Sequence, residues 1–397
     1  MSIRRAASGR HAGRGPVFVG SEFVAQYPEG GGVFWVPLQY LLGLRELGVD
    51  AWWLELLYGS GDAARDRARI AAFLAAADEM GVRERVVLVY FPENRREEPP
   101  GRRESFGLPL DELSARVKDG LLLNLANSVP APLRAEFART ALLDLDPGPF
   151  QIWAREYDIG VGQHDAHLTI GVHLGAEDCP IPLDGVDWKR FWPPVHLPSW
   201  TTEEAPAPSA PYTTVTQWWT EQYAFLDGEC FDCNKRTSYL ANLAIPALAG
   251  VPIELAANIH PGERADRALL ARHGWRLADP NVVAGTPARF RAYVQGSRGE
   301  LGCVKPAYAK SRSGWLSDRT VCYLASGRPC VVEATGAEAH LPESAGLRTF
   351  REAAEAAAAL REVECDWQAA SRAARALAAE VCSSRVVLPE VLRASGG

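Results

Sequence analysis

Residues 310–336 read KSRSGWLSDRTVCYLASGRPCVVEATG, and their order of loop, helix and strand decides the fold. A polar loop containing Gly314 leads into a short helix, Gly327 ends that helix, and a buried strand at 330–332 precedes a second loop that ends at Gly336. This order places the start of a helix and the end of a strand at one edge of a parallel sheet. The free N–H groups and partial positive charge of a helix start suit a diphosphate.

Length and composition favour a soluble two-domain protein. The chain has 397 residues, of which 47% are hydrophobic and 23% charged, and its net charge is −7. This charge argues against broad binding of nucleic acid or an anionic membrane. No apolar run reaches the roughly 20 residues that span a bilayer. The basic stretch 1–15 lacks the apolar segment of a secretory signal, so we expect a disordered tail and a cytoplasmic location.

Strands alternate with helices twice along the chain, which predicts two α/β units with mostly parallel sheets. In the first unit we expect strands at 16–23, 51–57, 85–90, 120–124 and 167–172, helices at 34–47, 63–80 and 110–117, and a helix end and strand within 134–145. In the second we expect strands at 212–219, 251–255, 301–305 and 330–332 and helices at 235–244, 264–273, 286–294, 350–360 and 366–381. The Pro-rich stretch 199–211 reads as the linker.

Six segments carry a resemblance to bacterial GT-B glycosyltransferases related to families 1 and 4, over roughly residues 17–392. They are GGVFWVPLQYLLGL (31–44), DLDPGPFQ (144–151), QHDAHLTIG (163–171), GAEDCPIP (175–182), SRGEL (297–301) and SRSGWLSDR (311–319). The resemblance implies two Rossmann-like domains facing across a cleft. The acceptor would bind mainly to residues 16–205 and a nucleotide-sugar to residues 206–380, and the segment 381–397 would cross back to the first domain.

The donor diphosphate is expected at the loop and helix start of the opening stretch. Glycine allows close backbone approach, serine hydroxyls add donors, and arginine forms a bidentate fork with phosphate. The expected residues are Ser311, Ser313, Gly314, Trp315, Ser317, Asp318 and Arg319. The alternative for Ser317 and Asp318 is an ordinary helix cap with an acidic first turn. The resemblance also implies a diphosphate contact from Lys235; an exposed surface lysine, or Arg236 in its place, remains open.

Two further loops are candidate parts of the same site. Glu333, Thr335 and Gly336 follow the buried strand and are expected to bind the donor sugar, although a solvated turn would give the same pattern. Gly30, Gly31 and Gly32 form an interdomain glycine loop between the first strand and the first helix. Close approach of the backbone to a ligand would explain them, and so would a flexible turn. Their pattern is not the G-x-G-x-x-G of NAD-binding proteins.

A cluster of ionisable residues in the first domain is the candidate for acceptor activation. His164 and Asp165 are expected to be catalytic, because a sugar hydroxyl needs a general base if the reaction inverts the anomeric centre. The cluster also has spacing compatible with a metal site, with Asp144, Asp146 or His173 as a third ligand. A histidine pair satisfied by backbone groups is the remaining alternative.

The sequence therefore predicts a glycosyltransferase that moves a sugar from a nucleotide-diphosphate donor to a small-molecule, natural-product or glycan acceptor, without an obligatory metal or other cofactor. Retaining GT-B enzymes carry two glutamates around the donor, and here Gly314 and Cys322 occupy those positions. This departure keeps two alternatives open. One is a non-hydrolysing sugar-nucleotide epimerase, and the other is a catalytically degenerate nucleotide-sugar-binding protein.

Overall fold

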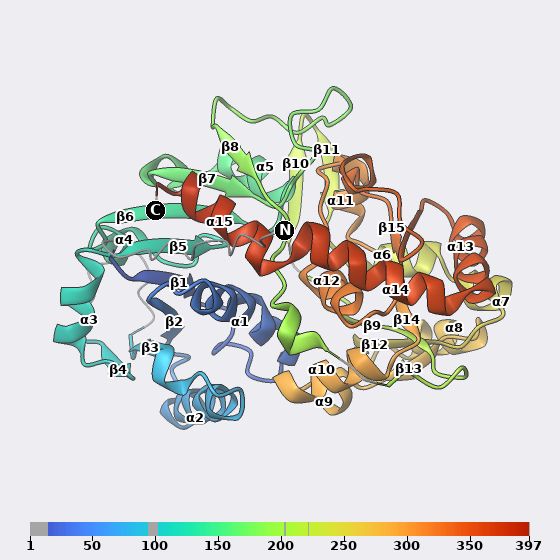
Figure 1. Cartoon of the computed structure of the whole chain (residues 1–397), viewed down its shortest axis with the longest axis horizontal. Helices are drawn as coiled ribbons and strands as arrows, with labels where there is room; N and C mark the ends of the chain where they lie inside the picture. Colours follow the sequence, from blue (N-terminus) through green and yellow to red (C-terminus); the bar gives the residue numbers. More distant parts are fainter. Residues whose placement is uncertain (1–14, 94–101, 202–203, 221, 397) are drawn as a thin grey trace, which may run out of the picture.

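The computed structural model describes residues 15–93, 102–201, 204–220 and 222–396, which form two α/β units side by side (Figure 1). The tail expected at 1–15 lies, except for Gly15, outside the described residues. Each unit has its own mostly parallel sheet with helices on its faces, which confirms the expected α/β class with two Rossmann-like domains. Within the described ranges, no helix combines the length and apolar character needed to cross a lipid bilayer.

The first sheet has eight strands in the order β4-β3-β2-β1-β5-β6-β7-β8, and all neighbours are parallel except β3 and β4. Its strands are β1 (Val17–Ser21), β2 (Ala51–Tyr58), β3 (Val86–Phe91), β4 (Glu104–Phe106), β5 (Leu121–Leu125), β6 (Arg139–Asp144), β7 (Ala166–Thr169) and β8 (Trp188–Arg190). The associated helices are α1 (Gly31–Glu46), α2 (Ala63–Glu79), α3 (Leu110–Val117), α4 (Ala131–Arg134) and α5 (Pro149–Glu156), with short turns η1 (Arg83–Arg85), η2 (Val161–Gln163) and η3 (Leu197–Trp200).

Both faces of the first sheet are covered, and the side chains of β2 show how. Trp53 and Leu57 pack into one hydrophobic cluster, whereas Trp52, Leu54 and Leu56 pack into another. Successive residues of a strand point to opposite faces, so a strand buried on both sides is mostly apolar. This explains the apolar runs that made β2 and β5 recognisable in the sequence; the buried polar residues within them, Glu55 and Asn124, accept hydrogen bonds from the backbone N–H groups of Val24 (2.8 Å) and Val129 (2.8 Å).

The second sheet has six parallel strands in the order β13-β12-β9-β14-β15-β16. They are β9 (Tyr212–Gln217), β12 (Ile253–Asn258), β13 (Arg276–Ala278), β14 (Gly299–Gly302), β15 (Cys330–Glu333) and β16 (Leu347–Phe350). The helices are α6 (Lys235–Ala241), α7 (Ile245–Ala249), α8 (Arg264–Arg272), α9 (Pro280–Val283), α10 (Pro287–Gly296), α11 (Pro306–Ser311), α12 (Asp318–Ala325), α13 (Ala353–Cys365) and α14 (Trp367–Leu377), with a short turn η4 (Ala337–His340). The expected helix 235–244 ends earlier, at Ala241, and a second short helix, α7, follows it from Ile245. The expected helix 366–381 is formed by α14 and a π-helical turn, η5 (Ala378–Cys382).

A hairpin that the sequence analysis treated as loop connects β9 to α6. Its strands β10 (Tyr223–Leu226) and β11 (Glu229–Asp232) pair antiparallel around a turn at Asp227 and Gly228, both of which have positive φ. Ala224 and Phe231 on its buried face pack with Ile152 of α5 and other apolar residues of the first unit. The hairpin therefore joins the two units.

The end of the chain returns to the first unit. Figure 1 shows α14 and α15 (Ser384–Ala394) in red, running from the second unit across to the first. The residues Leu388 and Val391 of α15 are fully buried and belong to the same hydrophobic cluster as Leu41 of α1. Packing of α15 against α1 and β7 therefore ties the two units together.

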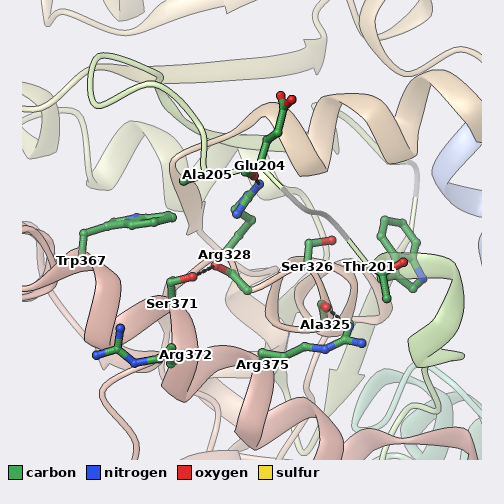
Figure 2. Close-up of a pocket in the computed structure, with 12 residues that line it drawn as sticks. Thr201, Glu204, Ala205, Ala325, Ser326, Arg328, Trp367, Ser371, Arg372 and Arg375 are labelled. Atoms are coloured by element: carbon green, nitrogen blue, oxygen red, sulfur yellow. Dashed lines mark hydrogen bonds between the residues drawn. The ribbon is translucent and has the colours of Figure 1, made fainter.

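The segment between the units is held by Arg328, which follows α12, and by Arg375 of α14; both line a pocket near the carboxyl end of α12 (Figure 2). Arg375 donates to the carbonyl of Leu197 (3.3 Å), and Arg328 donates to the carbonyls of Glu204 (3.0 Å) and Gln295 (3.0 Å from Nε). A shallow pocket of about 380 Å³ lies between these side chains. Because Arg328 and Arg375 donate to backbone carbonyls of the protein, we interpret these side chains as structural contacts and not as a ligand site.

Candidate active site

A cavity of about 450 Å³ lies between the two units, at the carboxyl ends of their central strands. The first unit contributes the loop before α1 and its first turn, including Glu29 and Gly31. The second contributes the end of β9, the first residues of α6 and α12, and Lys305 after β14. Ligands of open parallel sheets bind beyond the carboxyl ends of strands, so this cavity is the candidate active site.

Two helices begin at the cavity wall. α12 starts at Asp318 and has Ser317 as its N-cap, whose Oγ accepts a hydrogen bond from the Arg319 N–H (3.2 Å). α1 starts at Gly31 after a glycine N-cap that offers no side-chain acceptor. The first N–H groups of a helix have no partner within the helix and carry partial positive charge. The two helix starts therefore make the cavity favourable for an anion.

Three cationic side chains line the same cavity, and two of them have acidic partners. Arg319 donates from Nε to Glu300 (2.6 Å), and Lys305 donates to Asp146 of the first unit (2.9 Å). The third, Lys235, has no hydrogen-bond or ion-pair partner among the described residues and lies 5.9 Å from the centre of the Trp315 ring. Burial lowers the pKa of Lys235 well below its usual value, and the charges of Arg319 and Lys305 lower it further.

The carboxyl group of Asp318 is an unusual neighbour for an anion site. It lines the cavity at the start of α12, and burial raises its pKa to about 6. A protonated Asp318 adds no negative charge, whereas an ionised one would repel a bound phosphate. The anion affinity of the cavity is therefore expected to depend on pH.

Only part of the expected donor loop faces the cavity. Ser317, Asp318, Arg319 and Lys235 line it, as predicted from the sequence. Ser311, Ser313, Gly314 and Trp315 do not line it. Ser311 and Ser313 are fully buried, and the backbone N–H of His173 donates to the Ser313 carbonyl (3.1 Å). A Cβ on Gly314, whose φ is +82°, would lie 2.4 Å from that His173 nitrogen, so the glycine allows the donor loop to pack against the first unit.

Trp315 and the expected sugar-binding residues gather next to the main cavity. Trp315, Glu333 and Thr335 line a small adjoining pocket that shares Ser317 and Arg319 with the main cavity. Burial raises the pKa of Glu333, whose Oε2 accepts a hydrogen bond from the Val304 N–H (2.9 Å). Thr335 donates from Oγ1 to the Trp315 carbonyl (2.7 Å) and its own carbonyl accepts from the Gly314 N–H (2.9 Å).

Two glycines of the expected sets are explained by packing between the units. Gly336 has a φ of +95°, and its Cβ would lie 2.9 Å from the Arg312 carbonyl oxygen and 3.0 Å from the His173 ring. Gly31 donates its N–H to the Ala284 carbonyl (3.1 Å), and a Cβ there would lie 2.2 Å from the Thr286 carbonyl oxygen.

The glycine triplet as a whole lines the cavity and also touches its neighbours closely. A Cβ on Gly32 would lie 2.8 Å from the Phe290 ring, and one on Gly30 would lie 2.4 Å from the Tyr27 ring. Close approach of α1 to the second unit therefore favours glycine at positions 31 and 32, whereas Gly30 allows the chain to pass close to Tyr27 of its own unit. The flexible-turn alternative does not describe them, because Gly31 and Gly32 form the first turn of a helix.

The expected catalytic pair is not brought to the donor loop. Asp165 directly precedes β7 at its amino end, the opposite edge from the cleft, and accepts hydrogen bonds from the Thr140 N–H (2.7 Å) and hydroxyl (3.1 Å). His164 is buried, with Nε2 3.0 Å from the Asn124 amide nitrogen. Burial, together with the charge of Arg134, lowers the pKa of His164 to about 4, so the ring is neutral near pH 7.

This arrangement fits the alternative in which these histidines are satisfied by neighbouring protein groups, since His167 also contacts the Val161 carbonyl (2.8 Å). The third-ligand candidates lie elsewhere in hydrogen bonds of their own: Asp144 accepts from Thr169 (2.7 Å) and Gln151 (2.7 Å). Within the described part of the chain, no group of three or more histidine, cysteine or acidic residues could hold a metal ion. The side chains of His164, His167 and Asp165 therefore contact neighbouring protein groups, which gives them a structural role.

Lys305 and Glu300 are functional candidates that the sequence analysis missed. Lys305 lies three residues after the end of β14, at the carboxyl end where cleft residues gather, and this position was the available signal. Glu300 lies within β14 and is fully buried under Arg319. Glu300 was missed because the sequence around a single glutamate in a strand does not show which cation it will face in the folded protein.

Comparison with solved structures places this architecture among known ones. HepE of Anabaena, in complex with UDP and glucose, is 12% identical, with a TM-score of 0.53 over 97% of this chain and 100% of that chain. AviGT4, a glycosyltransferase involved in avilamycin A biosynthesis, is 13% identical, with a TM-score of 0.50 over 96% of this chain and 97% of that chain. A glycosyltransferase from Rickettsia africae is 11% identical, with a TM-score of 0.50 over 96% of this chain and 98% of that chain.

No protein-family model matches the chain, and no curated protein matches it in sequence. At identities this low, structural similarity establishes the fold and leaves the chemistry to be argued from the site. The two facing Rossmann-like domains, the cleft at their strand ends and the returning terminal helix agree with these structures along nearly the whole chain. The chain has the GT-B fold.

Proposed function

We propose that this chain is a glycosyltransferase that uses a nucleotide-diphosphate sugar as donor. The observation that carries the proposal is the side chain of Lys235, which has no hydrogen-bond or ion-pair partner among the described residues and lines a cavity where α1 and α12 both begin. Desolvation and the neighbouring cations disfavour the charged form of the half-buried Lys235, and an anionic ligand would favour that form by supplying a negative charge. The HepE structures, which contain UDP or UDP-glucose, support a nucleoside diphosphate as that anion.

The diphosphate would be the leaving group of the transfer. Lys235, Arg319, Lys305 and the N–H groups at the start of α12 would stabilise the negative charge that develops as the glycosidic bond breaks. This arrangement supports leaving-group departure without an obligatory metal. Glu333 and Thr335, beside the same helix start, would hold hydroxyl groups of the transferred sugar.

The acceptor would enter from the first unit, whose glycine loop forms the opposite wall of the cavity. We propose a small-molecule or glycan acceptor and a cytoplasmic enzyme of the hexosyl- or pentosyltransferase class. His164 and Asp165 are not part of this proposal, because their side chains are engaged away from the cleft.

The experiment is a calorimetric titration of UDP into the wild-type protein and into Lys235→Met. Loss of one charge-assisted hydrogen bond costs about 1.5–3 kcal/mol, so we expect affinity to fall about 10- to 100-fold. Lys189→Met is the matched control, because Lys189 is an exposed lysine paired with Asp187 (2.6 Å) outside the cleft. Unchanged binding in Lys235→Met, or no binding of UDP, GDP, TDP or CDP to the wild type, would contradict the proposal.

A second measurement separates transfer from epimerisation. A transferase releases nucleoside diphosphate only when an acceptor or water accepts the sugar, whereas an epimerase converts the nucleotide-sugar alone. NMR of the nucleotide-sugar pool with and without a panel of acceptors therefore decides between them. Binding without either reaction would identify a nucleotide-sugar-binding protein.

A further inference from the structure

Trp219 is a large aromatic side chain that remains half exposed at the mouth of the cleft. Its relative exposure is 50%, whereas the preceding Trp218 is fully buried. Trp219 lines the main cavity, in the loop between β9 and β10. Single exposed hydrophobic side chains are common on protein surfaces, but of those among the described residues Trp219 alone lines the main cavity.

The ring is held in place by charged groups from two helices. The Arg236 guanidinium lies over it, 4.9 Å from the ring centre, and the indole Nε1 donates to Glu263. Arg236 is itself fixed by two hydrogen bonds to Asp266, of 2.6 and 2.9 Å. Asp266 also accepts from the Trp218 indole (2.9 Å). The guanidinium covers one face of the Trp219 ring, and the indole hydrogen bond fixes its orientation.

We propose that Trp219 is a stacking plate for a sugar ring, and that it forms a carbohydrate subsite at the mouth of the cleft. The apolar face of a pyranose packs against an aromatic ring, and its hydroxyl groups need polar neighbours. Gln217 and Thr220 line the cavity beside the ring and can supply those hydrogen bonds. This inference rests on the proposed function. It adds a sugar-binding subsite that is separate from the cationic side chains expected to bind the diphosphate.

The exposure of the ring favours a sugar over a nucleobase. Bases are distinguished by hydrogen bonds to their edges, and such bonds discriminate best where water is excluded. Trp219 stands at a rim that is open to solvent, and the residues beside it are hydroxyl- and amide-bearing. A sugar keeps part of its hydration shell at such a rim. The sugar could belong to the donor or to the acceptor, since both would meet at this cavity.

The test compares the wild type with Trp219→Ala, Trp219→Phe and Phe225→Ala. Phe225 is the matched control, because it is 57% exposed in the neighbouring hairpin and does not line the cavity. Affinities for UDP and UDP-glucose are measured by calorimetry. Binding of free glucose, galactose, mannose and their disaccharides is measured by saturation-transfer NMR.

We expect Trp219→Ala to lose about fivefold to tenfold in affinity for a sugar ligand, with UDP affinity retained, and Trp219→Phe to restore most of the loss. A loss confined to UDP-glucose identifies the donor sugar, and a loss confined to free saccharides identifies the acceptor. An equal loss for UDP and UDP-glucose would assign the plate to the nucleobase and overturn the inference. Affinities for UDP-glucose and for free saccharides that are both equal in all variants would also overturn it.

The two proposals fail separately in this experiment. A wild-type protein that does not bind UDP but binds saccharides through Trp219 contradicts the nucleotide-sugar function and keeps the subsite. A protein that binds UDP through Lys235, with no sugar effect of Trp219, keeps the function and removes the subsite.

Discussion

At the scale of single residues, the cleft holds an imbalance of charge. Lys305 and Arg319 are each paired with a carboxylate, whereas Lys235 lacks such a partner among the described residues. Asp318, at the start of α12, also lines the cavity, and its raised pKa of about 6 reflects its burial. An anion that binds here gains from Lys235 and meets repulsion from Asp318 once that carboxyl is ionised.

This balance predicts that donor affinity falls as the pH rises through 6. The pKa of Asp318 is about 6 in the empty cleft. A bound diphosphate would raise that pKa further, so binding takes up protons above pH 6 and weakens as the pH rises. We expect Asp318→Asn to bind UDP-glucose more tightly than the wild type above pH 6, with the ratio growing by up to about tenfold per pH unit.

The measurement is calorimetry from pH 5 to 8 with EDTA present, so that no divalent cation bridges the carboxylate and the phosphates. UDP-glucose is the suitable probe because both its phosphates are esterified and do not titrate in this range. A constant ratio of the two affinities across the series would show that Asp318 does not face the ligand.

The residue-level predictions succeeded where local chemistry sets the role of a side chain. Ser317 caps α12, which was the alternative to its predicted diphosphate contact, and this role follows from its place before an apolar helix. The burial of Ser313 and the partners of His164 depend on segments far away in the chain, and no local pattern reveals them. Trp219 and Trp218 are adjacent and alike in sequence, yet only tertiary packing decides which one is exposed.

At the scale of elements, the position of α1 depends on glycine. The expected helix 34–47 begins three residues earlier, at Gly31, because the glycine triplet allows its first turn to lie against α9 and α10. The hairpin between β9 and α6 was missed because each strand has only four residues. The Asp227-Gly228 pair between alternating residues was the available signal, since this dipeptide favours two-residue hairpin turns.

Gly31→Ala is expected to separate α1 from the second unit. The new Cβ would lie 2.2 Å from the Thr286 carbonyl oxygen and 2.4 Å from that of Ala284, and backbone atoms cannot move aside as a flexible side chain can. We expect a loss of about 1–3 kcal/mol in the free energy of unfolding, and weaker UDP binding. Chemical denaturation and calorimetry measure the two effects.

Gly296→Ala is the matched control for this substitution. Gly296 is also helical, at the end of α10, and a Cβ there would meet no heavy atom within 4 Å. Alanine should stabilise that helix by up to about 1 kcal/mol. If both variants were stabilised alike, the contact between α1 and the second unit would not limit the position of the helix.

At the scale of the whole molecule, one hydrophobic cluster extends across both units, and each unit also has a separate cluster of its own. The largest buried cluster contains Trp35 and Leu41 from the first unit, Phe290 and Leu324 from the second, and Leu388 from the returning helix. Alternation of strands and helices predicted two units, because each unit follows local periodicity. The extent of their contact depends on side chains hundreds of residues apart, such as Trp35, whose Nε1 donates to the Pro287 carbonyl (2.9 Å).

A shared core predicts that damage to the last helix is felt by both units. Leu388 in α15 is fully buried, and its side chain lies so close to Gly43 of α1 that a Cβ on that glycine would be 2.6 Å from it. Leu388→Ala leaves a cavity, so we expect a loss of about 2–5 kcal/mol in the free energy of unfolding. Because the cluster is continuous across the units, calorimetric unfolding should remain a single transition at a lower temperature.

The control for this prediction is Val386→Ala, since Val386 lies on the exposed side of the same helix, with a relative exposure of 48%. It removes apolar volume from α15 without opening a cavity, so its melting temperature should stay close to that of the wild type. If Leu388→Ala instead split the melting curve into two transitions and moved only one of them, the units would unfold independently. The returning helix would then stabilise the first unit alone, and closure of the cleft would have to depend on the contacts of Gly31 and Lys305.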